Sequence, residues 1–292
     1  MGWFSKKTNK SELSTAIDKL ASSPSVEDQK KFANVISSHV EEETGGPVPI
    51  HQDENGNRLK IITVFKTHVD IGFTDLPQKV IEKYSTNMLV DAIETCEKTA
   101  TFDKDHRFVW TLPSFPLYHA LRTADSEIID RCQKVIKNDQ LKWHALPFTL
   151  RTEFFNKEEL THCLNYAKEL SARFNKPMPI AAKMTDVPGH TQCLVDVLCE
   201  NGIKFLHLGC NPASTTPNVP TLFWWESKNG NRVLTYYNKN YGSSILPPEN
   251  WKYPVHLAMI QTNDNCGVQS YTVIEELEKE ALATYPDVQF TT

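Results

Sequence analysis

The sequence predicts an α/β fold in which a buried parallel sheet, either closed into a barrel or open and doubly wound, alternates with amphipathic helices. Short continuous apolar runs recur along the chain, as is typical of strands that are buried on both faces. Segments with helical spacing of apolar residues lie between most of these runs. Acidic residues stand at the ends of several runs, where α/β folds place their functional groups.

Length and composition restrict the class of protein before any motif is considered. The chain has 292 residues, of which 40% are hydrophobic and 23% are charged, so it is long enough for a large barrel or two modest domains. The formal net charge is −5, and no long cluster of lysine and arginine is present. A nucleic-acid partner is therefore not expected, because phosphate backbones are bound by basic surfaces.

Several features of the sequence predict a cytoplasmic protein. No apolar stretch is long enough to cross a bilayer, so no membrane partner is expected. The first residues are followed by polar sequence, and Lys6 stands where a myristoylation motif has serine or threonine. The seven cysteines show no C-x-x-C spacing and are interpreted as reduced thiols, most of them buried. The oligomeric state is left open.

Two parts are expected along the chain. Residues 1–45 are interpreted as an appendage of two short helices, since Leu13, Ile17 and Leu20 recur at helical spacing. Residues 46–292 are expected to form the α/β domain, which begins after a Gly-Gly-Pro break.

The elements of the α/β domain follow from the apolar pattern in chain order. Strands are expected at 59–67, 107–112, 141–147, 179–186, 203–209, 232–237 and 255–261. Helices are expected from about Leu76 and near 117–137, 157–174, 190–201 and 268–284. Residues 285–292 resemble a helix stop followed by the start of another strand. We therefore expect this chain to be the N-terminal part of a longer protein.

The first candidate site residues are His68 and Asp70, at the end of the first expected strand. Residues i and i+2 of a strand point to the same face, so this imidazole and this carboxylate converge on one point. Asp186 ends another apolar run, before a glycine turn. His68, Asp70 and Asp186 together offer the nitrogen and oxygen ligands that zinc accepts, and they require one more ligand or a water. The alternative is a structural His-Asp pair, because a single H-x-D triplet is common.

Asp264 ends the strand expected at 255–261 and is a second candidate catalytic acid. Opposite Asp186, it would complete the pair of carboxylates used in glycoside hydrolysis, with Asp186 as nucleophile and Asp264 as general acid/base. The alternative is that Asp264 caps a helix beginning near Val268. The sequence favours neither reading.

Other side chains near the expected strand ends are candidates for binding a sugar. Phe73, Trp110 and Tyr241 offer aromatic faces that pack against the C–H faces of pyranose rings, although most aromatic residues are found in cores. His144 is a candidate hydrogen-bond partner for substrate, with a structural role as the alternative. His190 is interpreted as a partner of Asp186 or as a packing residue.

Two motifs resemble a known enzyme family. Residues 67–73 (T-H-V-D-I-G-F) resemble the H-x-D-x-G-W signature of family 38 glycoside hydrolases, the class II α-mannosidases, with Phe73 in place of tryptophan. Residues 185–190 (T-D-V-P-G-H) resemble their D-P-F-G-H segment. The likeness is greatest to a mannosidase-related branch whose members read T-H-x-D-I-G-F-T and D-V-P-G-H-T.

Further segments extend this resemblance over residues 59–292. Residues 202–209 are similar to the next strand of the family, residues 263–264 fall where it has a G-D-D segment, and residues 287–292 fall where it enters another strand. Several motifs in the same order are more specific than any one of them.

The resemblance implies a seven-stranded β/α barrel, incomplete at its C-terminus, with a bound zinc ion. It implies that His68 and Asp70 are zinc ligands, that Asp186 is both ligand and nucleophile, and that Asp264 is the acid/base of a retaining hydrolase acting on α-mannosides. Members of the family draw a further zinc-binding histidine from sequence beyond the length of this chain.

Three hypotheses of function therefore remain. The leading one is a zinc-dependent α-mannosidase-type glycosidase. The second is a metal-dependent carbohydrate deacetylase, which uses a similar barrel and His/Asp site. The third is a truncated barrel without catalysis that binds carbohydrate or serves as a scaffold.

Overall fold

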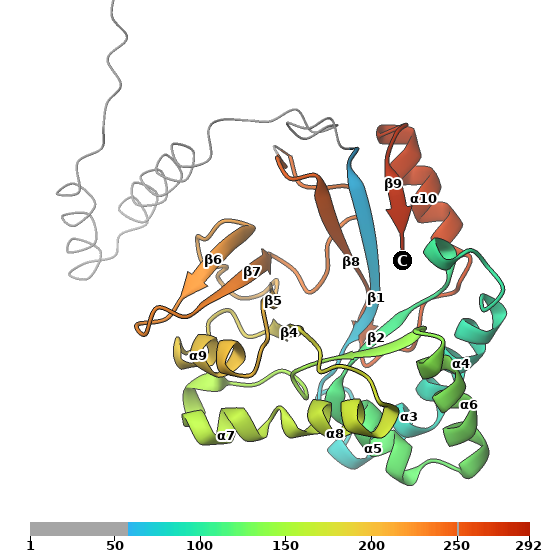
Figure 1. Ribbon diagram of the computed structural model, residues 1–292, viewed down its shortest axis with the longest axis horizontal. Helices are drawn as coiled ribbons and strands as arrows, with labels where there is room; N and C mark the ends of the chain where they lie inside the picture. Colours follow the sequence, from blue (N-terminus) through green and yellow to red (C-terminus); the bar gives the residue numbers. More distant parts are fainter. Residues whose placement is uncertain (1–57, 250) are drawn as a thin grey trace, which may run out of the picture. The chain divides into compact units, whose positions relative to one another are not determined.

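The computed structural model describes residues 58–249 and 251–292. The helical appendage predicted for residues 1–45 lies outside this described part. All seven strands predicted for the α/β domain are present, with bounds that differ by a few residues (Figure 1).

The first sheet contains the strand that carries His68. Its order is β3-β2-β1-β8, and β9 pairs with the start of β1. All pairs in this sheet are parallel, as expected for continuous apolar runs. The bounds are β1 Lys60–His68, β2 Trp110–Pro113, β3 Leu141–His144, β8 Val255–Asp264 and β9 Gln289–Thr291.

The second sheet contains the strand that carries Asp186. Its order is β4-β5-β7-β6, with parallel pairing except between β6 and β7. The bounds are β4 Ala181–Asp186, β5 Phe205–Cys210, β6 Leu222–Glu226 and β7 Arg232–Asn238. The strand β6 was not among the strands expected from the sequence. An Asn229-Gly230 turn, with Gly230 at φ 81°, joins it to β7, and Asn-Gly is a strong hairpin signal.

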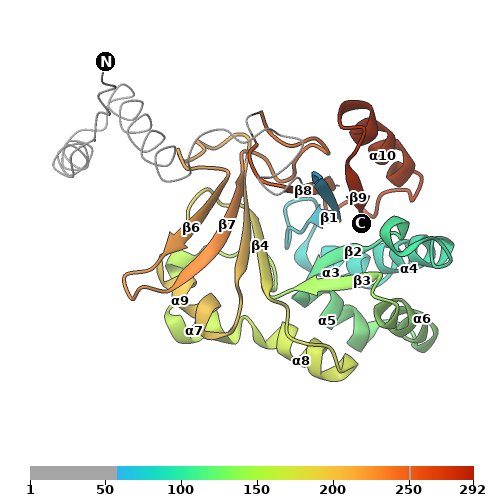
Figure 2. The ribbon, with the colours of Figure 1, turned by 45° about the horizontal axis from the view of Figure 1, so that its top comes forward.

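The closed seven-stranded barrel is not confirmed, although all seven expected strands exist. Within the described residues no strand ladder joins the two sheets. Isolated backbone hydrogen bonds instead link a strand of one sheet to a segment that follows a strand of the other. They run from Ala145 N, just after β3, to Ala181 O on β4 at 2.9 Å, and from Ser243 N, after β7, to Met259 O on β8 at 3.0 Å. The observed architecture is thus a mixed α/β fold with two largely parallel sheets (Figure 2).

Helices cover both sheets. Figures 1 and 2 show α4, α5 and α6 against the first sheet and α7 and α9 near the second. Their bounds are α3 Pro77–Ser85, α4 Asn87–Lys98, α5 Ser114–Thr123, α6 Ser126–Lys137, α7 Lys157–His162, α8 Asn165–Phe174, α9 Cys193–Glu200 and α10 Val273–Thr284. No helix in the described part of the chain combines the length and the apolar character needed to cross a bilayer.

Three helices expected to be continuous are each divided in two. The first break is at Thr86, between α3 and α4, where φ is −119° and ψ is −96°. The second follows Thr123, where Ala124 and Asp125 are extended. The third is at Cys163 and Leu164, between α7 and α8. At the first two breaks a threonine hydroxyl donates to the carbonyl four residues earlier, Thr86 to Glu82 and Thr123 to His119. Such bonds weaken the local helix, and apolar periodicity does not report them.

The two sheets have separate apolar clusters on the sides that face the helices. Buried polar residues lie on β1, β4 and β5 instead, including Lys66, Lys183 and His207. Lys66 Nζ donates to Tyr241 O and to Gln261 Oε1, each at 2.5 Å, and so ties β1 to β8 and to the segment after β7. These contacts bring the ends of strands from both sheets to one place.

Candidate active site

The end of β1 places His68 beside the end of β8. The two strands are in parallel register, with His68 opposite Asp264 after a shift between Lys66 and His68. His68 is buried, and Asp70 is partly exposed just beyond the strand. The chain then turns at Gly72, whose φ of +103° favours glycine, before α3 begins. This sharp turn keeps Asp70 at the strand end.

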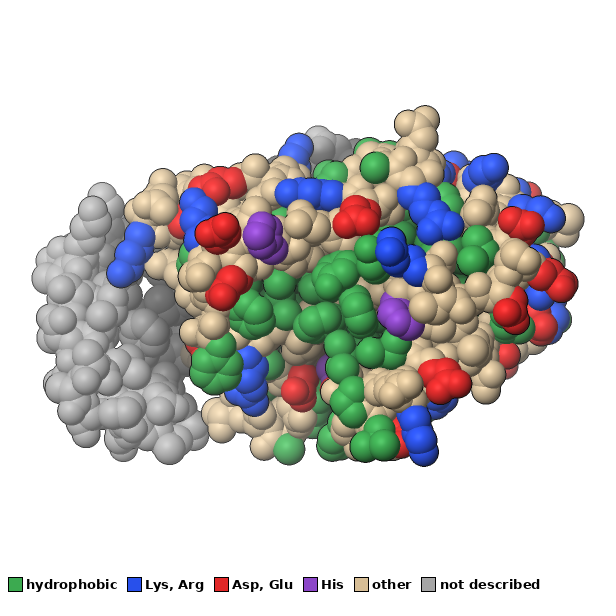
Figure 3. Space-filling view, turned by 90° about the horizontal axis from the view of Figure 1, so that it is seen from below, with side chains coloured by type: hydrophobic (Ala, Val, Ile, Leu, Met, Phe, Trp, Pro, Cys, Tyr) green, Lys and Arg blue, Asp and Glu red, His purple; other side chains and the backbone are tan. Residues whose placement is uncertain are grey.

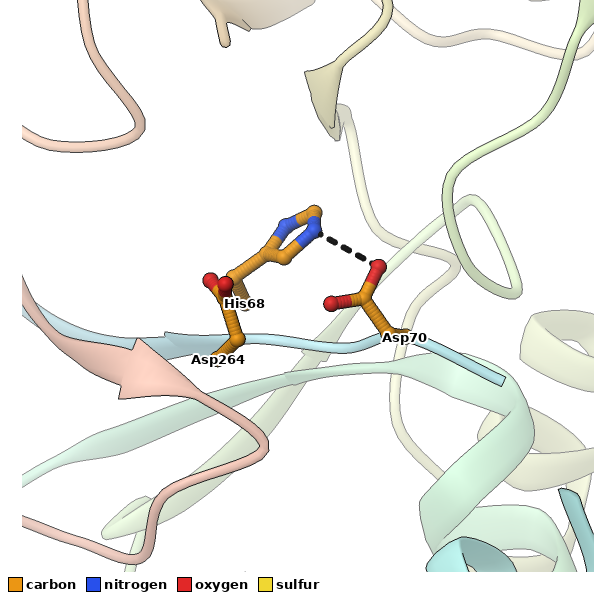
Figure 4. Close-up of side chains that lie close together, drawn as sticks. All are labelled: His68, Asp70 and Asp264. Atoms are coloured by element: carbon orange, nitrogen blue, oxygen red, sulfur yellow. Dashed lines mark hydrogen bonds and ion pairs between the residues drawn. The ribbon is translucent and has the colours of Figure 1, made fainter. Parts of the chain in front are cut away.

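His68, Asp70 and Asp264 form a compact cluster (Figure 4). One ligand atom from each residue lies within 4.8 Å of the others. His68 Nε2 is 3.0 Å from Asp70 Oδ1. One imidazole nitrogen and two carboxylates are a donor set that suits zinc. The residues present therefore fit the metal that the sequence analysis expected, although the third member of the cluster is Asp264, whereas Asp186 was expected.

Thr185 fixes the orientation of the His68 ring. Its Oγ1 lies 2.6 Å from His68 Nδ1, and Lys183 Nζ donates to the same oxygen at 3.3 Å. A metal bound at Nε2 requires the imidazole proton on Nδ1, so Thr185 would then accept that proton's hydrogen bond. Lys183 is buried, and burial lowers the pKa of its ammonium group to about 8.

Asn265 clamps the two strand ends together. Its side chain accepts from Asp70 N at 3.0 Å and donates to Asp70 O at 3.0 Å. It also accepts from the Tyr84 hydroxyl at 3.2 Å, while its backbone N–H donates to His68 O at 2.9 Å. Its φ of 49° is uncommon for a residue other than glycine. This side chain therefore fixes the loop that carries Asp70 relative to Asp264.

Asp186 ends β4 in a strained conformation, with a φ of 88°. Such strain persists only where surrounding contacts enforce it, and it is concentrated at functional sites. The Tyr241 hydroxyl donates to Asp186 Oδ1 at 2.5 Å, and Asn211 Nδ2 donates to the same oxygen at 2.8 Å. The Tyr241 ring also lies 4.3 Å from the His68 ring, centroid to centroid. Tyr241 thus links Asp186 to the His68 cluster.

The two candidate catalytic acids have environments that separate their pKa values. Burial alone would raise the pKa of Asp186, but hydrogen bonds from Tyr241 and Asn211 and the nearby His68 outweigh it, so that this pKa is lowered. The pKa of Asp264 is raised, chiefly by burial, and the charges of Asp70 and Asp186 add to that effect. Opposed shifts of this kind distinguish an ionised carboxylate from a proton donor.

A cavity of about 240 Å³ opens beside Asp70 and Asp186. These two acids line it from the ends of β1 and β4, and Phe148 and Arg151 line it from the segment after β3, whereas Asp264 is not part of its lining. A small polar ligand in this cavity can therefore reach Asp70 and Asp186.

The structure places the predicted substrate-binding residues in very different surroundings. Tyr241 bonds Asp186, and Phe73 is 86% exposed on the loop after Asp70. Trp110 is 1% exposed within the apolar core of the first sheet, which indicates a packing role. His144 is 5% exposed, and neither of its ring nitrogens has a hydrogen-bond partner among the described residues.

Two alternatives from the sequence are also decided by the structure. Asp264 does not cap a helix near Val268, because α10 begins at Val273 with Thr272 as its N-cap. His190 is not hydrogen-bonded to Asp186. Its Nδ1 lies 3.2 Å from Thr152 Oγ1, and burial lowers its pKa to about 4.

Three residues of the site were not expected from the sequence: Thr185, Asn211 and Asn265. Each acts through a hydrogen bond to a residue distant in the chain. Thr185 and Asn265 are direct neighbours of Asp186 and Asp264, so a search of the residues flanking each candidate acid would have included them.

The fold of the described residues is shared with carbohydrate-active enzymes. An α-mannosidase from Enterococcus faecalis V583 superposes with a TM-score of 0.61 at 16% identity, covering 80% of this chain and 28% of that one. An E. faecalis protein of glycosyl hydrolase family 38 gives a TM-score of 0.52 at 12% identity, with coverage of 80% and 26%. A 4-alpha-glucanotransferase from Thermococcus litoralis gives a TM-score of 0.51 at 14% identity, covering 80% of this chain and 39% of that one.

These similarities show that the described residues share an α/β fold with those enzymes. The chain belongs to glycosyl hydrolases family 38, because the model of that family's N-terminal domain matches residues 58–287. It spans about 28% of the length of the E. faecalis α-mannosidase. A search of curated proteins finds no match to the sequence.

Proposed function

We propose that this chain carries the zinc-dependent catalytic site of a retaining glycosidase that acts on α-mannoside-like carbohydrate. The observation that carries the proposal is the meeting of four residues from two sheets. His68, Asp70 and Asp264 cluster within 4.8 Å, and Asp186 shares a cavity with Asp70. Membership of family 38 supports the reaction class.

In this proposal Asp186 is the nucleophile. Tyr241 and Asn211 both donate to Oδ1, whereas no described residue donates to Oδ2. Oδ2 is therefore the oxygen that attacks the anomeric carbon, and the hydrogen bonds to Oδ1 keep the carboxylate ionised. Asp264 donates a proton to the departing oxygen and then accepts one from the attacking water.

His68 and Asp70 are the proposed metal ligands, joined by Asp186. Zinc, when bound, would supply a Lewis acid that binds sugar hydroxyls. Thr185 holds the His68 ring in place, and Asn265 holds the backbone of Asp70. The cluster in Figure 4 favours a competing assignment, in which Asp264 completes the metal site instead.

Asp264→Asn separates these two assignments. If Asp264 is the acid/base, the variant retains its zinc content and still cleaves an aryl α-mannoside with a good leaving group, while it loses activity on an oligosaccharide. If Asp264 is a metal ligand, zinc content measured by elemental analysis falls together with all activity.

The proposed function is tested by incubating the full chain with an aryl α-mannoside before and after EDTA treatment and zinc addition. We expect zinc-restored release of the aryl group, with NMR showing mannose first released as the α-anomer. Release of acetate from an acetylated sugar without cleavage would indicate a deacetylase. Sugar binding without either product would indicate a scaffold.

A further inference from the structure

A row of aromatic side chains extends away from the candidate site over α5 and α8. Figure 3 shows hydrophobic side chains gathered in the middle of the face seen from below Figure 1, where α5 and α8 lie. Phe148, Phe115, Tyr166 and Tyr118 make up the row. All four are partly exposed.

The four rings contact one another in sequence. Phe148 meets Phe115 at a centroid distance of 5.6 Å and an interplanar angle of 88°. Phe115 meets Tyr166 at 5.3 Å and 76°, and Tyr166 meets Tyr118 at 5.0 Å and 68°. Edge-to-face contacts of this kind fix the rings firmly. Each ring is thereby held in place while part of it remains open to solvent.

The row begins at the catalytic cavity. Phe148 lines that cavity together with Asp70 and Asp186. The row ends at Tyr118, whose ring is contacted by Arg122 at 5.2 Å from its centroid. Phe148 thus belongs both to the lining of the cavity and to the aromatic row, so the row is the surface that a longer ligand would meet next to the cavity.

The composition of this surface favours a carbohydrate over an apolar protein segment. The leucines of α5, Leu117 and Leu121, are buried in the apolar core, so the exposed part of the helix is aromatic and polar. Pyranose rings pack their C–H faces on aromatic rings, while their hydroxyls require polar partners. Tyr118, Tyr166 and the neighbouring His119 supply both kinds of contact.

We propose that this aromatic row binds the sugar units of an oligosaccharide beyond the one that occupies the catalytic cavity. The proposal rests on the proposed function and makes its substrate more specific. The natural ligand is then a chain of several sugars, and a single mannoside uses only the cavity.

The test measures binding by calorimetry to full-length protein with the Asp186→Asn substitution, which prevents turnover. The probes are methyl α-mannoside and an α-linked mannotetraose. We expect the tetraose to bind about tenfold more tightly, which corresponds to one or two aromatic contacts. The Tyr118→Ala/Tyr166→Ala double variant should lose most of that difference and bind methyl α-mannoside unchanged.

Three controls separate loss of the rings from loss of the fold. Tyr118→Phe/Tyr166→Phe keeps the rings and should retain most of the preference for the tetraose. Trp224→Ala removes an exposed aromatic residue on β6, outside the row, and should have no effect. Melting temperatures of all variants show whether the alanine substitutions unfold α5 or α8.

Equal binding of the two probes, or an unchanged preference in the alanine double variant, would overturn the inference. So would a dimer, detected by sedimentation, that the double variant dissociates, because the row would then be an interface between copies. If the unsubstituted chain hydrolyses mannosides but shows no preference for the longer ones, the proposed role of the aromatic row is rejected and the proposed function stands. If the chain prefers the tetraose through the rings of the row but hydrolyses neither substrate, the proposed function is rejected and the role of the row stands. If neither probe binds, both proposals are rejected.

Discussion

Asp186 and Asp196 follow one another closely in the sequence, and both accept several hydrogen bonds, yet their surroundings differ in kind. Asp196, on α9, accepts from Ser227 at 2.5 Å, Asn231 at 2.7 Å and Asn229 at 2.7 Å, and these bonds occupy both of its oxygens. In Asp186 both bonds converge on Oδ1.

This difference distinguishes a structural carboxylate from a candidate reactive one. The partners of Asp196 all belong to the turn between β6 and β7, so the carboxylate fastens that turn to α9. Asp186 instead has a strained backbone, an oxygen without a described donor and a position on a cavity. The number of hydrogen bonds alone does not separate the two roles, whereas the distribution of those bonds over the two carboxylate oxygens does.

The largest effect is expected for the substitution of Asp186, the candidate reactive carboxylate. Asp186→Asn removes the proposed nucleophile and should lower kcat for an aryl α-mannoside by about 10³-fold or more. Its melting temperature should change little, because the amide keeps the shape of the side chain. Asp196→Asn is the matched control and should retain kcat. Similar activity in both variants would remove the distinction drawn above.

Thr185→Val tests how the metal site is supported. The substitution keeps the shape of the side chain but removes the hydroxyl beside His68 Nδ1, and we expect zinc affinity to fall by about 10- to 100-fold. A competition titration with a chelating dye measures this affinity. Thr185→Ser keeps the hydroxyl and should bind zinc nearly as the parent does. A valine variant with parental affinity would show that His68 needs no such partner.

Tyr241→Phe tests, through the pH dependence of kcat/KM, whether the hydrogen bonds to Asp186 lower its pKa. The Tyr241 hydroxyl helps to lower the pKa of Asp186, so its loss raises that pKa towards the ordinary value. Because Asp186 acts when ionised in the proposed mechanism, the acidic limb of the kcat/KM profile should move to higher pH. Tyr237→Phe is the control, since the Tyr237 hydroxyl donates to Pro188 O instead. A shift to lower pH in Tyr241→Phe would contradict the assignment.

Asp196→Ala has the smallest expected effect on catalysis. It leaves Ser227, Asn229 and Asn231 without their shared acceptor, so the melting temperature should fall. Activity per folded molecule, measured well below the transition, should be unchanged. A selective loss of activity without loss of stability would show that Asp196 is more than a structural residue.

All the strands except β6 were predictable because their signal is local. Apolar runs such as residues 61–65 identified β1, and the residues at strand ends identified His68, Asp70, Asp186 and Asp264 as candidates. The convergence of His68, Asp70 and Asp264 follows from parallel pairing, since the C-terminal ends of parallel strands share one edge.

Features that depend on long-range hydrogen bonds were not predictable in the same way. Nothing in the local sequence shows that Asn265 bonds the backbone of Asp70, or that Thr185 meets His68. Trp110 was wrongly expected to bind substrate, because the sequence around an aromatic residue at a strand end is the same whether its side chain lies in a core or in a binding site. Accessibility separates these cases, and it is a property of the packed structure.

The clamp at Asn265 joins positions that are 195 residues apart. A ribosome makes β1 early and β8 late, so β1 has to wait with one edge unpaired while the intervening chain is synthesised. Closing so long a loop is slow, and an open strand edge invites aggregation. The geometry of the candidate site is thus among the last features of the fold that a nascent chain can complete.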